Sequence, residues 1–369
     1  MIDDDEFAAW FGLLHTPGLG RSGARAVLAE CGSPEAALHA LQSQPGRWIR
    51  PRARDATEPG EPLQGDLDQR LTRALAWRRE SPQERHVLTL GDPDYPAALL
   101  QTADPPLWLF VQGDVHALSR PAVAIVGSRR PTPQGLDHAR RFAQELGEAG
   151  WAVVSGLAQG IDGAAHEGAL AGGGTTVAVT GTGPDRVYPA RHRPLAQRIA
   201  AQGAVVTEFP PGTPPRAEHF PQRNRIIAGL SRGTLVVEAA LASGSLISAR
   251  LALEAGREVM AVPGSIDSPQ SQGCHALIKQ GAQLVESLDD ILAALGEPSR
   301  ARAAGLPEDS APESDPLLRA LGHEPMPLDA LAARTGLEAA ALQARLLDLE
   351  LAGQVARLPG ARFQRRGRG

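Results

Sequence analysis

Short apolar runs alternate with longer amphipathic stretches through the middle of the chain. Six of these runs, rich in valine and alanine, are predicted to be strands: residues 122–127, 152–156, 175–181, 204–208, 234–239 and 258–264. Uninterrupted apolar strands separated by helices are typical of a parallel sheet that is buried on both faces. The pattern therefore predicts a doubly wound α/β domain over residues 82–295, with ligands at the carboxyl ends of its strands.

Two segments rich in proline, charge and small residues are predicted to be linkers, residues 50–62 and 296–316. The chain is thus divided into a helical N-terminal part, residues 1–80, which includes the first of these segments, the middle domain, and a C-terminal part, residues 317–369. The sequence therefore predicts three folded parts.

The N-terminal part contains Gly18, Gly20 and Gly23 at the spacing of the dinucleotide fingerprint G-x-G-x-x-G. A helical stretch rather than a strand precedes these glycines, so the fingerprint is rejected. A tight turn between two helices is predicted instead, as in a helix-hairpin-helix or SAM-like domain. Two interpretations of this turn stay open: its amides grip a phosphate, or it only connects the helices.

The C-terminal part has the pattern of a winged helix. A short helix, a turn at Thr335 and Gly336, a longer amphipathic helix and a hairpin around 358–360 follow one another. The longer helix carries three acids against Arg345 alone, so it lacks the basic face that reading a DNA groove requires. A role in protein contact or regulation is therefore favoured for this domain over groove reading.

Composition narrows the class of partner. Hydrophobic residues make up 42% and charged residues 21% of the chain, as in a soluble globular protein, and the formal net charge is −5. A surface that is basic all over is excluded by this balance, so any contact with nucleic acid requires a local cluster of arginines.

Export, metal binding and ATP hydrolysis are not expected. The two cysteines, Cys31 and Cys274, lack the histidine spacing of a zinc site and form no disulfide framework, which favours a reducing cytoplasm. The acidic start is unlike a signal peptide, and no apolar run reaches the length of a membrane span. Lys279 lacks the glycines of a Walker A loop. No cofactor and no catalytic residue are assigned.

The first predicted strand ends in Gly127, Ser128, Arg129 and Arg130, directly before a helix that opens with proline. Amides and guanidinium groups in such a loop are suited to hold a phosphate. The alternative is structural, with Arg129 paired to an acid such as Asp162 or Glu238.

A second turn contains Gly156 and Gly160, which allow close approach of the backbone. Asp162 and His166 lie four residues apart on one face of the helix that follows. They are interpreted as a helix cap and a hydrogen-bonded neighbour rather than as an acid–base pair, because no nucleophile or metal ligand accompanies them.

Arginines also gather at the start of a later helix, in the run HFPQRNRIIAGL. Cations are unfavourable at a helix N-terminus unless an anion binds there, so Arg223 and Arg225 indicate an anion site. Phe220 next to them is either a stacking platform for a base or a plug in the core. A third turn, Ser243, Gly244 and Ser245, starts another helix. Several such helix starts along one sheet edge suit consecutive phosphates of a nucleic acid strand.

These same residues carry a resemblance to a known family. The strings VAIVGSRRPT, SGLAQGIDGAAHEGAL, FPQRNRIIAGLS, LVVEAALASGSLISA and AVPG resemble the signature of the DprA (Smf) family of DNA-processing proteins. The resemblance implies an extended Rossmann-like fold, a homodimer, and a protein that is not an enzyme. It also implies binding of incoming single-stranded DNA during natural transformation, displacement of single-strand binding protein, and loading of the RecA recombinase.

The resemblance also assigns residues. Ser128, Arg129 and Arg130 match the family's phosphate-gripping loop, and Phe220, Arg223 and Asn224 match its second DNA-contacting motif. By analogy, Gly156, Gly160 and the Ser243, Gly244, Ser245 turn line the same groove. His275, Leu277 and Ile278 fall in a helix that matches a dimerisation region, although Leu277 and Ile278 suit an intramolecular core equally well. Gln134 and His192 depart from the family pattern, which often has tyrosine and asparagine there.

Two rival functions stay open. The first is a nucleotide phosphoribohydrolase similar to the LOG family, which would use Arg232 and Glu238 around a glycine-threonine turn. The second is an adaptor with a vestigial groove, in which the terminal domains recruit partners. Binding of double-stranded DNA by the terminal domains also stays open.

Overall fold

A nine-stranded sheet forms the centre of the described part of the chain, in the order β1-β2-β6-β5-β4-β3-β7-β8-β9. The strands from β6 to β9 in this order are parallel, whereas β2 pairs antiparallel with both β1 and β6. The strands are β1 (Arg85–Thr89), β2 (Trp108–Gly113), β3 (Ala122–Val126), β4 (Ala152–Ser155), β5 (Thr176–Val179), β6 (Ala204–Thr207), β7 (Gly233–Val236), β8 (Glu258–Ala261) and β9 (Gln283–Leu284).

The six predicted strands correspond to β3 to β8, so the doubly wound, mostly parallel fold is confirmed. The sequence pattern did not predict β1, β2 and β9. β9 has only two residues, and β1 and β2 lie in a stretch interrupted by prolines. These strands extend the sheet beyond a minimal Rossmann arrangement at both edges.

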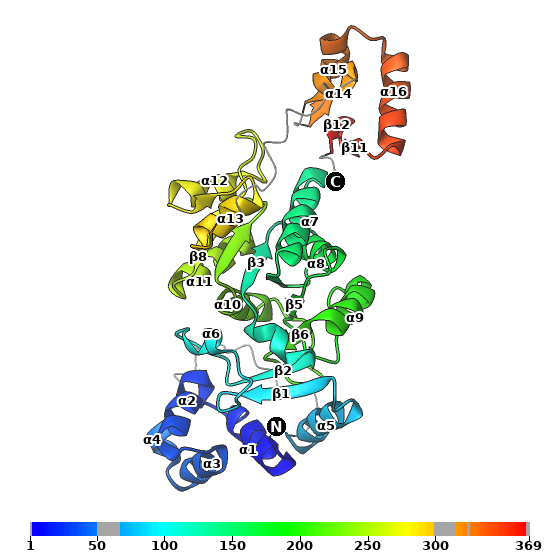
Figure 1. Ribbon diagram of the computed structural model, residues 1–369. Helices are drawn as coiled ribbons and strands as arrows, with labels where there is room; N and C mark the ends of the chain where they lie inside the picture. Colours follow the sequence, from blue (N-terminus) through cyan, green and yellow to red (C-terminus); the bar gives the residue numbers. More distant parts are fainter. Residues whose placement is uncertain (1, 50–66, 299–314, 323–324, 367–369) are drawn as a thin grey trace.

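The computed structural model describes residues 2–49, 67–298, 315–322 and 325–366 (Figure 1). The first predicted linker, residues 50–62, lies outside these residues, as does most of the second, residues 296–316. Among the described helices, none is long and apolar enough to cross a membrane.

Helices cover both faces of the sheet because its strand residues alternate between two cores. Val123 and Ile125 of β3 pack against α7 (Pro133–Glu148) and α8 (Ile161–Ala171), and α13 (Leu288–Ala294) joins this core. Ala124 and Val126 face the opposite core, with α10 (His219–Leu230), α11 (Gly244–Glu254), α12 (Gln272–Lys279) and α6 (Ala97–Leu100). A smaller core includes residues of α9 (Arg193–Gln202). Two short 3-10 helices, η1 (Val115–Ser119) and η2 (Ala190–His192), complete the domain's described elements.

The N-terminal helices pack against β1 and β2 through an aromatic cluster. Phe7, Phe11, Trp77, Trp108 and Phe110 are all buried in one core, with Trp108 and Phe110 ring centroids 5.0 Å apart. The helices are α1 (Asp4–Leu14), α2 (Gly20–Cys31), α3 (Pro34–Ser43), α4 (Pro45–Trp48) and α5 (Leu67–Glu80).

The predicted turn between two helices is present between α1 and α2. Gly18 and Gly20 have positive φ angles of +79° and +62°, which residues other than glycine rarely adopt. A Cβ on Gly18 would also lie 3.0 Å from the Ile49 side chain. The glycine spacing therefore serves a sharp helix connection rather than a strand-to-helix turn.

An ion-pair network ties these helices to the central domain. Asp104 forms ion pairs with Arg21 at 2.9 Å, with Arg25 at 2.5 Å and with Arg225 Nε at 3.0 Å. Arg225 also pairs with Glu208 at 2.5 Å. Burial alone would raise the pKa of Asp104, but the arginines, Arg225 foremost, hold the pKa below its usual value. The network joins α2, the loop before β2, the end of β6 and α10.

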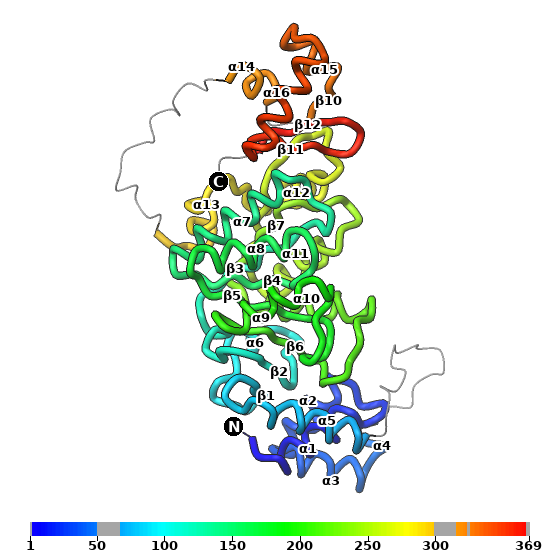
Figure 2. Tube along the Cα trace, turned by 90° about the vertical axis from the view of Figure 1, so that its right-hand side faces the viewer, coloured from blue at the N-terminus to red at the C-terminus, as the bar shows by residue number. Residues whose placement is uncertain are grey.

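The C-terminal domain is a winged helix. Its three-stranded sheet has the order β10-β12-β11, and its helices enclose a small leucine core. The elements are α14 (Pro316–Leu321), β10 (Met326–Pro327), α15 (Leu328–Thr335), α16 (Ala339–Leu351), β11 (Val355–Leu358) and β12 (Arg362–Arg365). Figures 1 and 2 show the N-terminal helices at one end of the central domain, beyond β1, and the winged-helix domain at the other end.

His166 makes the stability of the central domain depend on pH. This fully buried side chain contacts Thr176 Oγ1 through Nδ1 at 2.7 Å, and burial lowers its pKa to about 3. An unfolded histidine titrates near pH 6.5, so the unfolded chain binds protons first as the pH falls. The contribution is complete above about pH 6.5 and is lost as the pH falls towards the folded pKa.

We therefore expect about 2 kcal/mol of stability to be lost through His166 between pH 7 and pH 5. The variant His166→Gln cannot titrate, so its melting temperature is expected to fall less over this interval than that of the parent. His39→Gln, which replaces an exposed histidine, serves as the control. Equal pH dependence of the parent and His166→Gln would contradict this account.

Candidate functional site

A hollow of about 850 Å³ opens at the carboxyl ends of the parallel strands. We call this hollow the groove. Its wall combines segments that the sequence predicted separately and that lie up to about a hundred residues apart. They are Gly127, Ser128, Arg129 and Arg130 after β3, Phe220, Arg223 and Asn224 on α10, and Ser243, Gly244 and Ser245 at the start of α11. Because parallel strands all end at one edge, the loops that follow them converge there.

Arg129 lies over the ring of Phe220, with its guanidinium carbon 5.2 Å from the ring centroid. This distance is within the range of a cation–π contact. Among the described residues, no carboxylate forms an ion pair with Arg129, so the bracing contact to Asp162 or Glu238 is not formed. Tyr188 adds a second ring, 5.7 Å from that of Phe220. Arg129 and Tyr188 are exposed and Phe220 is half-buried, so the set is open to a ligand.

Hydrogen bonds fix the loop that carries Arg129 and Arg130. Ser128 Oγ accepts from the Arg130 amide at 3.0 Å, and the Ser128 carbonyl accepts from the Ile161 amide at 3.1 Å. Thr132 caps α7 by accepting from the Gly135 amide at 3.0 Å. The loop therefore presents its two arginines from a fixed backbone.

Glu238 holds the far end of this loop. Its carboxylate accepts hydrogen bonds from the Thr132 amide at 3.0 Å and from Thr132 Oγ1 at 2.6 Å. Burial raises the pKa of Glu238, and the bonds from Thr132 oppose this rise. Glu238 thus positions the loop and is not available to pair with the arginines of the groove.

Arg223 forms the floor of the groove. Its side chain is only 4% exposed, and Nη1 donates to the Val179 carbonyl at 2.9 Å, while Asp162 lies 3.9 Å from Nη2. Burial lowers the pKa of Arg223 to about 10, so this guanidinium stays cationic at neutral pH. A fixed positive charge therefore lies beneath the exposed arginines.

The two glycines assigned to the groove support it rather than line it. A Cβ on Gly156 would lie 1.5 Å from Arg223 Nη1, and one on Gly160 would lie 2.4 Å from the Ser128 carbonyl oxygen. Gly156 makes room for the buried guanidinium, and Gly160 lets α8 approach the Ser128 loop. Neither is among the lining residues.

Arg225 is not brought into the groove, contrary to the sequence interpretation. It lies two residues from Arg223, and on an α-helix this spacing turns a side chain to a different face. Asp104 and Glu208 neutralise it in the network described above. The positive charge of Arg225 is therefore used to attach the N-terminal helices.

The sequence interpretation also missed two residues of the groove, Arg216 and Tyr188. Arg216 precedes α10 in a proline-rich loop without a recognisable pattern, whereas Tyr188 lies in the glycine-rich loop of residues 181–192. With Arg216, the described residues of the lining include four arginines and a single carboxylate, that of Asp162. The groove is thus strongly cationic in a chain of net charge −5.

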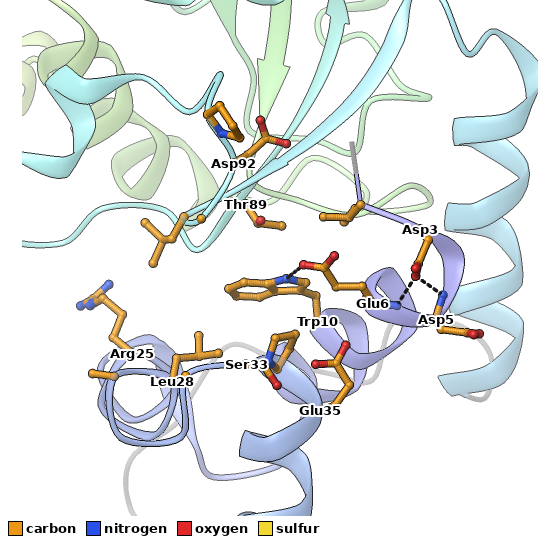
Figure 3. Close-up of a pocket in the computed structure, with 17 residues that line it drawn as sticks. Asp3, Asp5, Glu6, Trp10, Arg25, Leu28, Ser33, Glu35, Thr89 and Asp92 are labelled. Carbon is orange, nitrogen blue, oxygen red and sulfur yellow. Dashed lines mark hydrogen bonds between the residues drawn. The ribbon is translucent and has the colours of Figure 1, made fainter.

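A second large hollow has the opposite character (Figure 3). It holds about 940 Å³ between the N-terminal helices and the loop after β1, and its lining carries five acids against Arg25. Glu6 accepts from Trp10 Nε1 at 3.4 Å, and Asp3 accepts from the amides of Asp5 and Glu6. Its charge disfavours phosphates, so the groove is the better candidate for an anionic ligand.

Comparison with known proteins identifies the family. Residues 86–296 match the family model of DNA recombination-mediator protein A, and residues 297–361 match the DprA winged helix domain. The chain belongs to the DprA family.

Relatives of this DprA chain share most of its length. Protein Smf of Escherichia coli is 45% identical over 296 residues, which cover 78% of this chain and 79% of the relative. DNA processing protein DprA of Streptococcus pneumoniae is 48% identical over 202 residues, which cover 55% of this chain and 71% of the relative.

Two solved DprA structures are similar in fold. The Streptococcus pneumoniae structure has a TM-score of 0.61 at 36% identity and covers 78% of this chain and 97% of its own. The Helicobacter pylori structure has a TM-score of 0.52 at 33% identity, and the match covers 57% of this chain and 95% of that chain. It is described as giving insight into the single-stranded DNA binding mode of that protein.

The helix that resembles a dimerisation region is α12. Leu277 is 8% exposed and belongs to the core beneath the sheet, and Ile278 is half-buried against that core. His275 Nε2 lies 3.0 Å from the Gly264 carbonyl. In this DprA chain, Leu277 therefore packs in the core of its own chain, and contact of this helix with a second copy stays a prediction.

The residues of the possible enzymatic sites are not brought together. Asp162 accepts from the amides of Gly156 and Ala158, whereas His166 contacts Thr176, so the two do not form an acid–base pair. Arg232 precedes β7 and pairs with Glu297, while Glu238 follows β7, so the LOG-like pair is separated by the strand's length. Within the described residues, no three histidine, cysteine or acidic side chains are grouped to hold a metal ion.

The fit of Gly156 over Arg223 can be tested by substitution. Gly156→Ala is expected to displace the buried guanidinium from the Val179 carbonyl and to lower the free energy of unfolding by about 3 kcal/mol. Gly244→Ala at the start of α11 is the matched control, because no atom lies within 4 Å of the added Cβ. Chemical denaturation of both variants checks this, and equal stability of the two would contradict the role given to Gly156.

Proposed function

We propose that this protein is a single-stranded DNA-binding recombination mediator. It protects DNA that enters during natural transformation and loads the RecA recombinase onto it. The observation that carries the proposal is the groove, where four arginines and the ring of Phe220 gather against one carboxylate.

The chemistry of the groove favours a single strand over a duplex. Phe220 and Tyr188 offer ring faces, and a base can stack on a ring only when its own face is free, as in a single strand. Arg129, Arg130 and Arg216 supply cations along the same hollow for backbone phosphates. Neither kind of contact reads base edges, so strong sequence preference is not expected.

Membership of the DprA family supports the recombination role. The Helicobacter pylori relative, by the description of its structure, binds single-stranded DNA. Loading of RecA, a homodimeric state and a cytoplasmic location belong to the same proposal. No catalytic step is assigned, because the residues considered for one are held apart or engaged elsewhere.

Arg129→Ala is the first test of the proposal. Removal of one phosphate contact is expected to weaken binding of an oligothymidine and to reduce the salt slope, the change of log affinity with log salt concentration, by about 0.7. Fluorescence anisotropy over a range of salt concentrations measures both. The same variant is expected to slow assembly of RecA on DNA coated with single-strand binding protein.

Arg120→Ala is the matched control, since it removes an exposed arginine at the amino end of β3, away from the groove. Its affinity and salt slope are expected to equal those of the parent. If Arg129→Ala also equals the parent, the groove does not bind the strand, and the adaptor with a vestigial groove gains support.

Phe220→Leu tests base stacking separately from charge. Loss of one stacked base should cost about 1–3 kcal/mol, or roughly a 5- to 150-fold loss of affinity, with little change in salt slope. Phe220→Tyr keeps the ring and is expected to bind nearly as the parent does. Equal binding by Phe220→Leu and the parent would assign Phe220 to the core alone.

A further inference from the structure

The winged-helix domain borders a third hollow, of about 540 Å³, that adjoins the groove. We call it the wing hollow, because the hairpin of β11 and β12 forms one of its walls. Its described lining has two arginines and one carboxylate: Arg130, Pro131, Thr132, Ser265, Asp267, Ser268, Pro269, Gln270, Pro325, Leu358, Pro359 and Arg362. Arg130 and Gln270 line both the groove and the wing hollow, so the two are continuous.

Specific contacts fix the hairpin next to the groove. Arg366 donates from Nη2 and Nε to the two carboxylate oxygens of Asp137, at 2.7 and 3.2 Å. Gln364 Nε2 donates to Gln134 Oε1 at 3.0 Å. Gln134 and Asp137 lie in the first turns of α7, directly after the loop that carries Arg130. The wing is therefore attached to the element that begins at the groove.

The cations of the winged-helix domain gather on this hairpin and not on its longer helix. Arg357 and Arg362 are exposed, and Arg357 lies 6.0 Å from the ring of Phe363. Within the described residues, no carboxylate forms an ion pair with Arg130, Arg357 or Arg362. The longer helix α16 carries Asp348 and Glu350 instead, so the cations of this domain that suit DNA contact lie on the hairpin.

From this continuity we propose that the wing extends the DNA path. A single strand that leaves the groove at Arg130 enters the wing hollow, where its phosphates contact Arg362. The inference rests on the proposed function of the groove. Among the described residues that line the wing hollow, none is aromatic, so this segment of the path binds the phosphodiester backbone and does not stack bases.

The two parts of the path differ in how they respond to DNA length. An oligothymidine of about 6 nucleotides is expected to occupy the groove alone, and one of about 20 nucleotides to reach the wing as well. Arg362→Ala is expected to weaken binding of the longer strand about threefold to tenfold and to reduce its salt slope by about 0.7. Binding of the shorter strand should not change.

Arg334→Ala is the matched control, because it removes an exposed arginine from α15 of the same domain, outside the lining of the wing hollow. Its affinity for both strands is expected to equal that of the parent. Melting temperatures of both variants establish that the domain stays folded.

Asp137→Ala tests whether the wing must be attached. This change removes no cation but breaks both bonds to Arg366, so the longer strand is again expected to bind more weakly while the shorter one does not. An increase in affinity would instead make the wing a cover over the groove and would overturn the proposal.

The remaining outcomes separate this inference from the proposed function. If Arg362→Ala binds both strands as the parent does, the wing is not on the path, although the groove still binds DNA. If the variant weakens the shorter strand equally, or affects only duplex DNA, the proposed continuation is also overturned. If the parent binds neither strand, the proposed function itself fails.

Discussion

Parallel pairing of the central strands is the constraint on which the groove depends. β3 pairs in parallel with both β4 and β7, so the chain leaves each of these strands at the same edge of the sheet. The segments that follow, each leading into a helix, must therefore meet there. No single segment makes a binding site, but together they place Arg129, Arg223 and Ser243 around one hollow. A change of strand direction would scatter these residues over both edges.

Arg129, Arg223 and Arg225 have different tasks because their burial and their partners differ. Arg129 is exposed over a ring, Arg223 is buried under Gly156, and Arg225 is held by Asp104 and Glu208. Only the first has no carboxylate partner among the described residues, and it is therefore the one with charge to offer a polyanion. The net charge of the chain hides this arrangement, since the acidic hollow beside the N-terminal helices offsets it.

The groove and the wing hollow differ in the chemistry of their linings. Rings at Phe220 and Tyr188 suit bases, whereas the wing offers arginines without rings. Backbone contact and base stacking are both insensitive to sequence. The winged-helix domain is attached to α7 through its hairpin and not through its acidic helix α16.

The sequence by itself determined the local structure of this protein, because the periodicity of apolar residues depends only on near neighbours. It was sufficient for β3 to β8, for the glycine turn between α1 and α2, and for the helix and hairpin of the C-terminal domain. The motif strings also indicated the DprA family and the loops that line the groove. Only the tertiary structure decided the partners of individual side chains. Arg225 meets Asp104, a carboxylate 121 residues away, and Leu277 enters the core of its own chain. Such contacts depend on how distant elements pack, a relation that no local pattern records.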